Sequence, residues 1–484
     1  MSASPTTSPT PCLTGPCVAA GCADVNASCR LPLLALFAGA AFWLVVSSVF
    51  ALLASIKFHA PGFLADCAHL TYGRVHPAHL NTLAYGFAAQ AGLGVTLWIL
   101  AQTGKARLAL PGGAFVGALL WNLGVLVGVG SILNGGSTGF EFLEFSQAGS
   151  VILFFAYLLL ALAGVFTFSR RTEQSGCVSP WFLLAALFWF PWIYTTATAL
   201  TGCLPLRGVT QSLIAWWFAN NFLFVWLGLI GLGSIFFFAP KYAGRPLHSR
   251  QLALLAFGIL VGFGSWAGIP ASAPVPAWIS ALSAMGAFMS VVVVLAVAVN
   301  IKQTVGKCLC TRSEPVPKFI GVSLPFLFLF TLGNAATACA AVAATTNFTW
   351  LAPALTQLGL YGFFATTMFG AIYHIAPQLA GVETCCQRPL KIHFWLNLFG
   401  VLLLTGALAI GGIKQGRALS HAATPFLDVT RATLPFLRAS TMGDLFLLLG
   451  GLAFLVNLGG LLYGCFKKCC GSPSSCHGET EVKR

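Results

Sequence analysis

The sequence predicts an all-α membrane protein, a polytopic bundle of about twelve helices that cross the bilayer. Only 7% of its 484 residues are charged and 57% are hydrophobic, whereas about a quarter of the residues in a soluble domain are charged. A protein with so few charged residues cannot form a surface that is exposed to water. Lipid must therefore cover most of the surface of this protein. Apolar segments also recur from end to end, which favours one bundle over two or three soluble domains.

Each predicted crossing is a run of about 20 mainly apolar residues, the length of helix that spans the hydrocarbon core. These runs lie between a polar, Cys- and Pro-rich tail (1–30) and a Cys- and Lys-containing tail (467–484), so the membrane domain covers 31–466. The twelve runs are 31–55, 79–101, 111–133, 146–168, 179–201, 212–238, 251–269, 276–300, 318–344, 352–376, 390–412 and 442–466.

The 25 Lys and Arg residues predict the orientation of the bundle. With twelve crossings both termini share one side, and that side holds 18 of the basic residues against seven on the other. Basic residues accumulate on the cytoplasmic side, so we expect both termini in the cytoplasm of a bacterium and the bundle in its inner membrane. The longest loop on the outer side is expected at about 413–441. Thirteen of the sixteen cysteines fall on the cytoplasmic side, where free or lipidated thiols are expected.

The clearest candidate site opens the second run, at Arg74-Val75-His76-Pro77-Ala78-His79-Leu80-Asn81-Thr82. Polar groups are costly inside a bilayer, and those that persist are functional candidates. A neutral imidazole here could bind haem iron, with Arg74 placed to meet a propionate. The alternative is a histidine at the helix mouth that hydrogen-bonds to a neighbouring loop, and spacing alone favours this alternative.

The pattern Arg-x-x-Pro-x-His-x-Asn resembles the low-spin haem site of haem-copper oxidase subunit I, closest to the cbb-type cytochrome c oxidases. The acidic loop with Glu141 and Glu144 is also similar to that of the bacterial nitric oxide reductase large subunit. The resemblance implies that these carboxylates lie near haem propionates, although solvated loop carboxylates explain them equally well. Further segments resemble the family in its own order: 139–145, 216–221, 266–268 and 369–373.

The departures from the family pattern matter as much as the matches. The resemblance implies six metal-ligand positions, and only one of them, His79, carries a histidine here. The copper-ligand positions read Asn220, Pro270 and Ala271, the cross-linked tyrosine reads Gly264, and the two haem-ligand positions of the tenth run read Leu355 and Gln357. Amide, proline and alanine side chains are poor or impossible replacements for the imidazoles that hold copper. We therefore expect no copper and at most one haem b, bound through His79.

The sequence thus predicts a cbb-type cytochrome c oxidase subunit I-like protein of a respiratory electron-transfer assembly, with a degenerate oxygen-reduction site. Two alternatives stay open: an active terminal oxidase or nitric oxide reductase with replacement ligands, and a transporter or sensor on the same bundle. Whether the chain is an enzyme is open for that reason. The expected partners are the lipid bilayer and respiratory oxidase subunits or a cytochrome c. Nucleic acid is not expected, because the basic residues lie in short loops rather than on one face.

Overall fold

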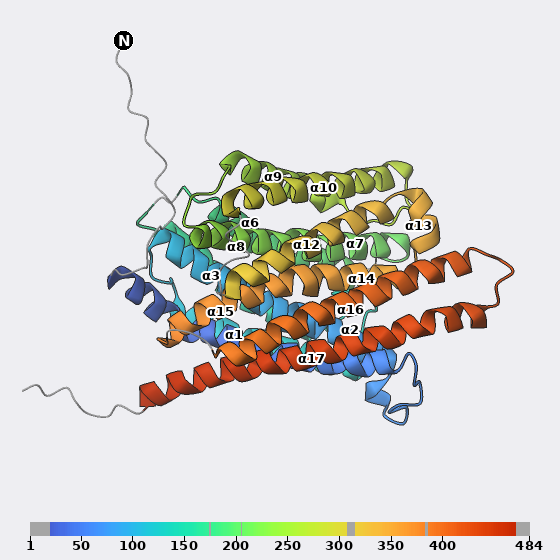
Figure 1. The fold of residues 1–484 in the computed structure, drawn as a ribbon, viewed down its shortest axis with the longest axis horizontal. Coiled ribbons are helices and arrows are strands. Elements are labelled where there is room, and N and C mark those ends of the chain that lie inside the picture. The colour runs from blue at the N-terminus through green and yellow to red at the C-terminus, as the bar shows by residue number, and fades with distance from the viewer. Residues whose placement is uncertain (1–19, 174–175, 205, 307–314, 383–385, 471–484) are drawn as a thin grey trace, which may run out of the picture.

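The computed structural model describes residues 20–173, 176–204, 206–306, 315–382 and 386–470, and the regular structure in these ranges is all helical. The helices lie side by side along the long axis of the molecule (Figure 1). In chain order the elements are α1 (Ala20–Ile56), η1 (Ala68–Leu70), α2 (Tyr72–Asn81), η2 (Thr82–Ala89), α3 (Gln90–Gly104), α4 (Pro111–Leu133), α5 (Gln147–Ser169), α6 (Ser179–Thr198), η3 (Ala199–Cys203), α7 (Val209–Asn220), η4 (Asn221–Trp226), α8 (Leu227–Ala243), α9 (Arg250–Gly262), η5 (Gly264–Trp266), α10 (Ala277–Val305), α12 (Pro315–Thr337), α13 (Ala340–Thr346), α14 (Leu351–Gln357), η6 (Leu358–Ala365), α15 (Thr366–Ala380), α16 (Gln387–Leu419) and α17 (Phe426–Cys470).

The predicted membrane bundle is confirmed: within the described ranges, eleven helical stretches are long and apolar enough to cross a bilayer. The seventh predicted run, 251–269, is the exception, because its apolar helix is shorter and covers only Arg250–Trp266. The chain leaves the helix there for two reasons. Gly268 has a φ of +98°, which a helix cannot contain, and prolines at 270, 274 and 276 have no backbone N–H to donate to a helix.

Three crossings form the centre of the bundle: the second (Tyr72–Gly104), the sixth (Val209–Ala243) and the tenth (Leu351–Ala380). Their most apolar stretches are 94 to 100% buried, against 50% or less for the other crossings. Each contains a π-helical segment, η2, η4 or η6. Single π turns inside α-helices are frequent at functional sites. These three crossings also carry His79, Asn220 and Gln357.

The prediction of a long outer loop at 413–441 is wrong, because most of these residues are helical. Helix α16 continues to Leu419 and α17 begins at Phe426, so the pair forms a hairpin that reaches past the other helices (Figure 1). The two helices pack along this extension, where Lys414 Nζ lies 4.7 Å from the ring centroid of Phe436. A lysine over an aromatic face is attracted to it, and this contact helps to keep the extension helical.

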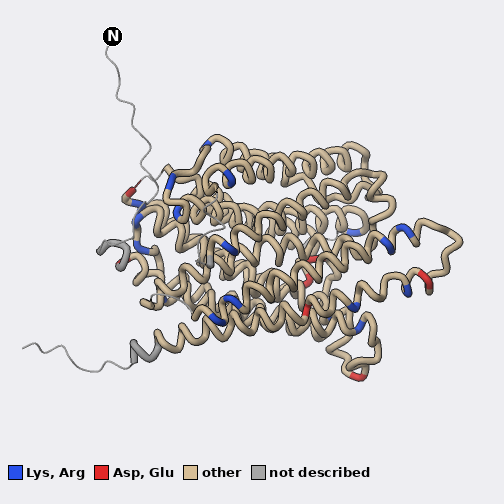
Figure 2. The backbone as a smooth tube through the Cα atoms, viewed as in Figure 1, with Lys and Arg blue, Asp and Glu red and all other residues tan. Residues whose placement is uncertain are grey.

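Both described ends of the chain lie at the same end of the bundle (Figure 1), as an even number of crossings requires. Figure 2 shows Lys and Arg mainly toward the two ends of the helices and few of them along the middle. We call the end opposite to the termini the distal end. The expectation of free thiols at the terminal end is wrong for Cys177, which is disulfide-bonded.

Candidate functional site

His79 is buried on α2, near the distal end of the second crossing. Its Nδ1 lies 3.1 Å from the backbone oxygen of Ser47 on α1, and its Nε2 lies 2.9 Å from the side-chain nitrogen of Gln357. Because an amide nitrogen can only donate, His79 Nε2 accepts this bond and the proton of the ring is on Nδ1. The imidazole is therefore neutral, and both of its nitrogens are hydrogen-bonded within the protein.

The structure brings His79 and Gln357 together, but their spacing does not fit a haem. A haem iron held by His79 at this nitrogen would need the lone pair of Nε2, and the amide nitrogen of Gln357 has no lone pair to offer a metal. Here the two nitrogens are 2.9 Å apart and share a hydrogen bond. His79 also does not line the large cavity described below. As they are arranged, the ring of His79 and the amide of Gln357 are in direct contact, which leaves no room for an iron atom between these two nitrogens.

Arg74, which the motif placed at a propionate, has a different partner. Its Nη1 donates to the backbone oxygen of Leu133 at 3.0 Å. Leu133 is the last residue of α4, and the final carbonyls of a helix lack partners within the helix. Arg74 therefore satisfies the end of α4, and the structure does not place it beside the ring nitrogens of His79.

The acidic loop between α4 and α5 reaches the same region from the distal end. Asn81 donates to a carboxylate oxygen of Glu144 at 2.8 Å. Burial raises the pKa of Glu144 to about 7, and the bond from Asn81 opposes that rise. The side chain of Glu141 is accessible because it faces the cavity. Enclosure by the protein raises the pKa of Glu141, and a hydrogen bond from Thr356 lowers it.

Asn220 lies at the end of α7. The resemblance places a copper-binding histidine at this position. The side-chain nitrogen of Asn220 donates to the backbone oxygen of Gly264 at 2.9 Å, and the next residue, Asn221, donates to Ser265 at 2.9 Å. Gly268 also approaches so closely that a Cβ there would collide with the Cβ of Asn220. The side-chain amides of Asn220 and Asn221 thus connect the segment after α9 to the sixth crossing. The bond from Asn220 to Gly264 joins the two positions at which the resemblance implies a histidine and a tyrosine.

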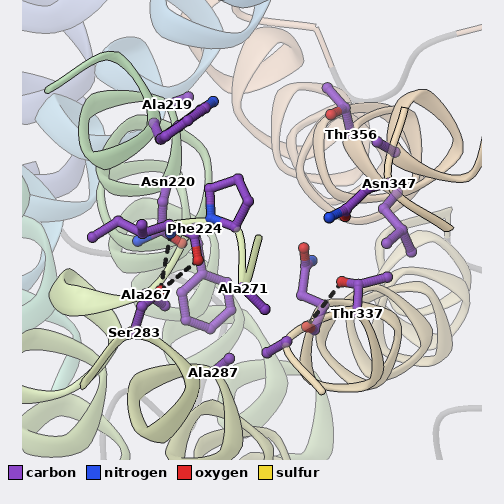
Figure 3. A pocket seen from close by; sticks show the side chains of 18 of the residues that line it. Ala219, Asn220, Phe224, Ala267, Ala271, Ser283, Ala287, Thr337, Asn347 and Thr356 are labelled. Atoms are coloured by element: carbon purple, nitrogen blue, oxygen red, sulfur yellow. Dashed lines mark hydrogen bonds between the residues drawn. The ribbon is translucent and has the colours of Figure 1, made fainter. Parts of the chain in front are cut away.

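A cavity of about 730 Å³ lies beside Asn220. Figure 3 shows Asn220, Ala271 and Thr356 around it, on elements far apart in the sequence. The substituted ligand positions Pro270 and Leu355 also line it, so four of the five altered positions share one site. Apart from Glu141 and the indole of Trp216, its polar side chains are neutral amides and hydroxyls: Asn220, Ser272, Ser283, Ser290, Thr331, Asn334, Thr337, Thr346, Asn347, Thr349 and Thr356.

The lining of this cavity does not fit a haem or a copper ion. Of the described residues that line it, none is a His, Cys, Lys or Arg, and Glu141 is the one ionisable group. Haem iron and copper are held mainly by imidazole or sulfur ligands, and none of these residues is a cationic side chain that could pair with a propionate. Across the described ranges, no group of three or more His, Cys, Asp or Glu residues is placed to hold a metal ion.

Sequence reasoning missed Asp444, a buried carboxyl on α17. The signal was present, because Asp444 is an acidic residue inside the last predicted run, 442–466, and ionisable residues inside a crossing are candidates by default. It also missed Ser47, whose contact with His79 no spacing in the sequence indicates.

Comparison with known proteins is consistent with this arrangement of helices. Residues 32–446 match the family model "Cytochrome C and Quinol oxidase polypeptide I". The chain is 26% identical over 444 residues to cytochrome c oxidase subunit 1 of Rhodobacter capsulatus, covering 86% of this chain and 82% of that protein. It is 25% identical over 407 residues to the cbb3-type cytochrome c oxidase subunit CcoN1 of Stutzerimonas stutzeri, covering 81% and 85%. A solved heme-copper terminal oxidase dimer contains a chain of similar fold, with a TM-score of 0.65 at 12% identity over 87% of this chain and 84% of that one.

Proposed function

The chain belongs to the cytochrome c and quinol oxidase polypeptide I family, and from this premise we propose that it is a cbb-type subunit I-like component of a respiratory electron-transfer assembly that has lost its own oxygen-reduction centre. The observation that carries the proposal is the cavity beside Asn220. It lies where the substituted ligand positions converge, and neutral amides and hydroxyls line it in place of imidazoles.

The bond from Asn220 to Gly264 supports the loss of the copper site. In a copper centre the side chain on the sixth crossing must present a lone pair to the metal. Here the nitrogen of the Asn220 amide is committed to a backbone carbonyl at 2.9 Å. A side chain that would coordinate copper in a copper centre here forms a hydrogen bond within the protein. This bond holds the sixth crossing and the segment after α9 together.

The contact between His79 and Gln357 supports a structural role for His79. A haem b could bind His79 only after this hydrogen bond opens and the two central helices separate. Opening it would leave Gln357 with no partner, since its carbonyl oxygen already has none, and unpaired buried polar groups are costly. We therefore assign His79 to the packing of the second crossing against the tenth.

The names of the relatives indicate the partners that this role needs. The proteins from Rhodobacter and Stutzerimonas are named as subunits of cytochrome c oxidases. We propose that this chain assembles in the membrane with respiratory oxidase subunits or a cytochrome c, with both termini in the cytoplasm of a bacterial cell.

Oxygen consumption tests the proposal. The protein, purified from its native membrane with whatever subunits accompany it, is given reduced cytochrome c. We expect no uptake of oxygen attributable to this chain, and therefore the same rate for the wild type and for His79→Leu. Uptake that His79→Leu abolishes would instead show an active oxidase with replacement ligands.

The size of the cavity favours a second candidate function, a sensor or transporter that binds a small molecule. Ligand sites commonly measure about 300–1,000 Å³ and have mostly apolar walls with a few polar groups. Native mass spectrometry of the purified protein tests this function, with Ala271→Trp as the variant that fills the cavity. A bound molecule present in the wild type and absent from Ala271→Trp supports it, and identical spectra reject it.

A further inference from the structure

A buried carboxyl, Asp444, lies among hydroxyl groups between α17, α1 and η6. Asp444 is 7% exposed, and Ser55 on α1 hydrogen-bonds to its carboxyl. Tyr361 on η6 is a second buried titratable side chain near this carboxyl. Within the described part of the chain, no Lys or Arg forms an ion pair with Asp444. A buried carboxylate without a cation is unfavourable, so this group is expected to hold a proton.

A continuous chain of side chains links this carboxyl to the distal end of the bundle. The hydroxyls of Ser55 and Thr441 are 2.7 Å apart. Thr441 in turn lies 3.2 Å from Nε2 of His59, which is half-buried in the turn after α1. Each hydroxyl in this chain can both accept and donate a hydrogen bond, which is the requirement for passing a proton from one group to the next. The hydroxyl of Thr441 also donates to the backbone oxygen of Leu437 at 3.0 Å, so it must rotate away from that oxygen to pass a proton on.

The elements packed around Asp444 bring few other titratable groups. Helix α16 meets α17 at this level through Leu404, against which Gly443 packs. The titratable groups that face the carboxyl are therefore Tyr361 from η6 and, through Thr441, His59 from the turn after α1.

We propose that Asp444 is a proton-binding site that exchanges protons with the distal face of the membrane along Ser55, Thr441 and His59. The site connects to the centre of the bundle through Tyr361. Tyr361 lies four residues after Gln357, and residues at this spacing share one face of a helix. A change in the protonation of Asp444 thus acts on the helix that holds His79 in place.

Infrared spectroscopy of the full chain in lipid vesicles tests this site. A protonated carboxylic acid gives a carbonyl stretching band that a carboxylate lacks. We expect the wild-type spectrum at neutral pH to contain such a band that is absent from Asp444→Asn and shifted in Asp444→Glu. The matched control is Asp428→Asn on the same helix, where the carboxyl is exposed and paired with Arg431, and it should leave the band unchanged.

Exchange into heavy water tests the path. The shift of the band caused by deuterium should be slower, by about tenfold or more, in the double variant Ser55→Ala, Thr441→Val than in the wild type. If the band is missing from the wild type, or persists unchanged in both Asp444→Asn and Asp444→Glu, the site is refuted. If the double variant exchanges as fast as the wild type, the path through these hydroxyls is refuted.

Discussion

The hydrogen bond between His79 and Gln357 makes a prediction that separates a structural role of His79 from a haem-binding role. In Gln357→Leu the amide is lost, and His79 Nε2 is left buried without a donor. Such an unpaired group costs about 1–3 kcal/mol. Part of this cost is offset, because the substitution also removes the carbonyl oxygen of Gln357, which has no partner. We expect the free energy of unfolding to fall by about 1 kcal/mol.

His79→Leu should cost more, because it removes the contacts of both ring nitrogens. The amide of Gln357 loses its acceptor, and the backbone oxygen of Ser47, which lies inside α1 and keeps its helical partner, loses a second donor at 3.1 Å. One buried donor left unpaired, together with the loss of a second hydrogen bond, predicts a loss of about 2–4 kcal/mol. The double variant should cost less than the sum of the single variants, by a coupling energy of about 1 kcal/mol.

The assay is denaturant unfolding in detergent micelles, followed by tryptophan fluorescence and by absorbance in the haem region. If the loss in the free energy of unfolding of the double variant equals the sum of the losses of the two single variants, the direct contact is refuted. A haem absorbance that is lost in His79→Leu and kept in Gln357→Leu would refute the structural role, because the imidazole would then be an iron ligand.

Four further variants, one of them a control, test the rest of the site by the same unfolding assay. Asn220→Leu removes the side-chain donor to the carbonyl of Gly264, which keeps the longer bond from the N–H of Ala267 at 3.3 Å, and should cost about 1 kcal/mol, whereas the control Asn347→Ala, which loses an exposed bond, should cost well under 1 kcal/mol. Gly268→Ala should cost about 2 kcal/mol or more, because φ is +98° and the new Cβ meets Asn220; a loss below about 0.5 kcal/mol would contradict that geometry. The pKa of Glu144 is raised from 4.5 to about 7 in the fold. Its contribution to the free energy of unfolding, up to about 3 kcal/mol, is therefore present at acid pH and is lost as the pH rises through that interval. Glu144→Gln should flatten this part of the stability profile, and an unchanged slope would count against the buried carboxyl.

The helices could be predicted from the sequence because their signal is local. A run of about 20 apolar residues has few alternatives to a membrane helix, and eleven of the twelve predicted runs are long enough to cross. The two errors have physical causes. The glycine and the prolines after Trp266 shorten the seventh helix, and charged residues near Lys414 resemble a loop although they lie on a long helical hairpin.

The site was predictable only in part, because its contacts join distant segments. The substitutions at Asn220 and Gln357 could be read from their flanking motifs. Their new partners could not, since the bonds to Gly264 and His79 connect residues 44 and 278 positions apart. Asp444 was visible as an acidic residue in an apolar run, but the hydroxyls around it come from other helices.

Haem and metal analysis of the purified protein tests the central claim most directly. A reduced-minus-oxidised spectrum is recorded with and without carbon monoxide, and iron and copper are quantified against protein on the same sample. The lining of the cavity and the contact of His79 with Gln357 predict no carbon monoxide-binding haem and no stoichiometric copper in this chain. A carbon monoxide-sensitive haem together with one copper per chain would contradict the account.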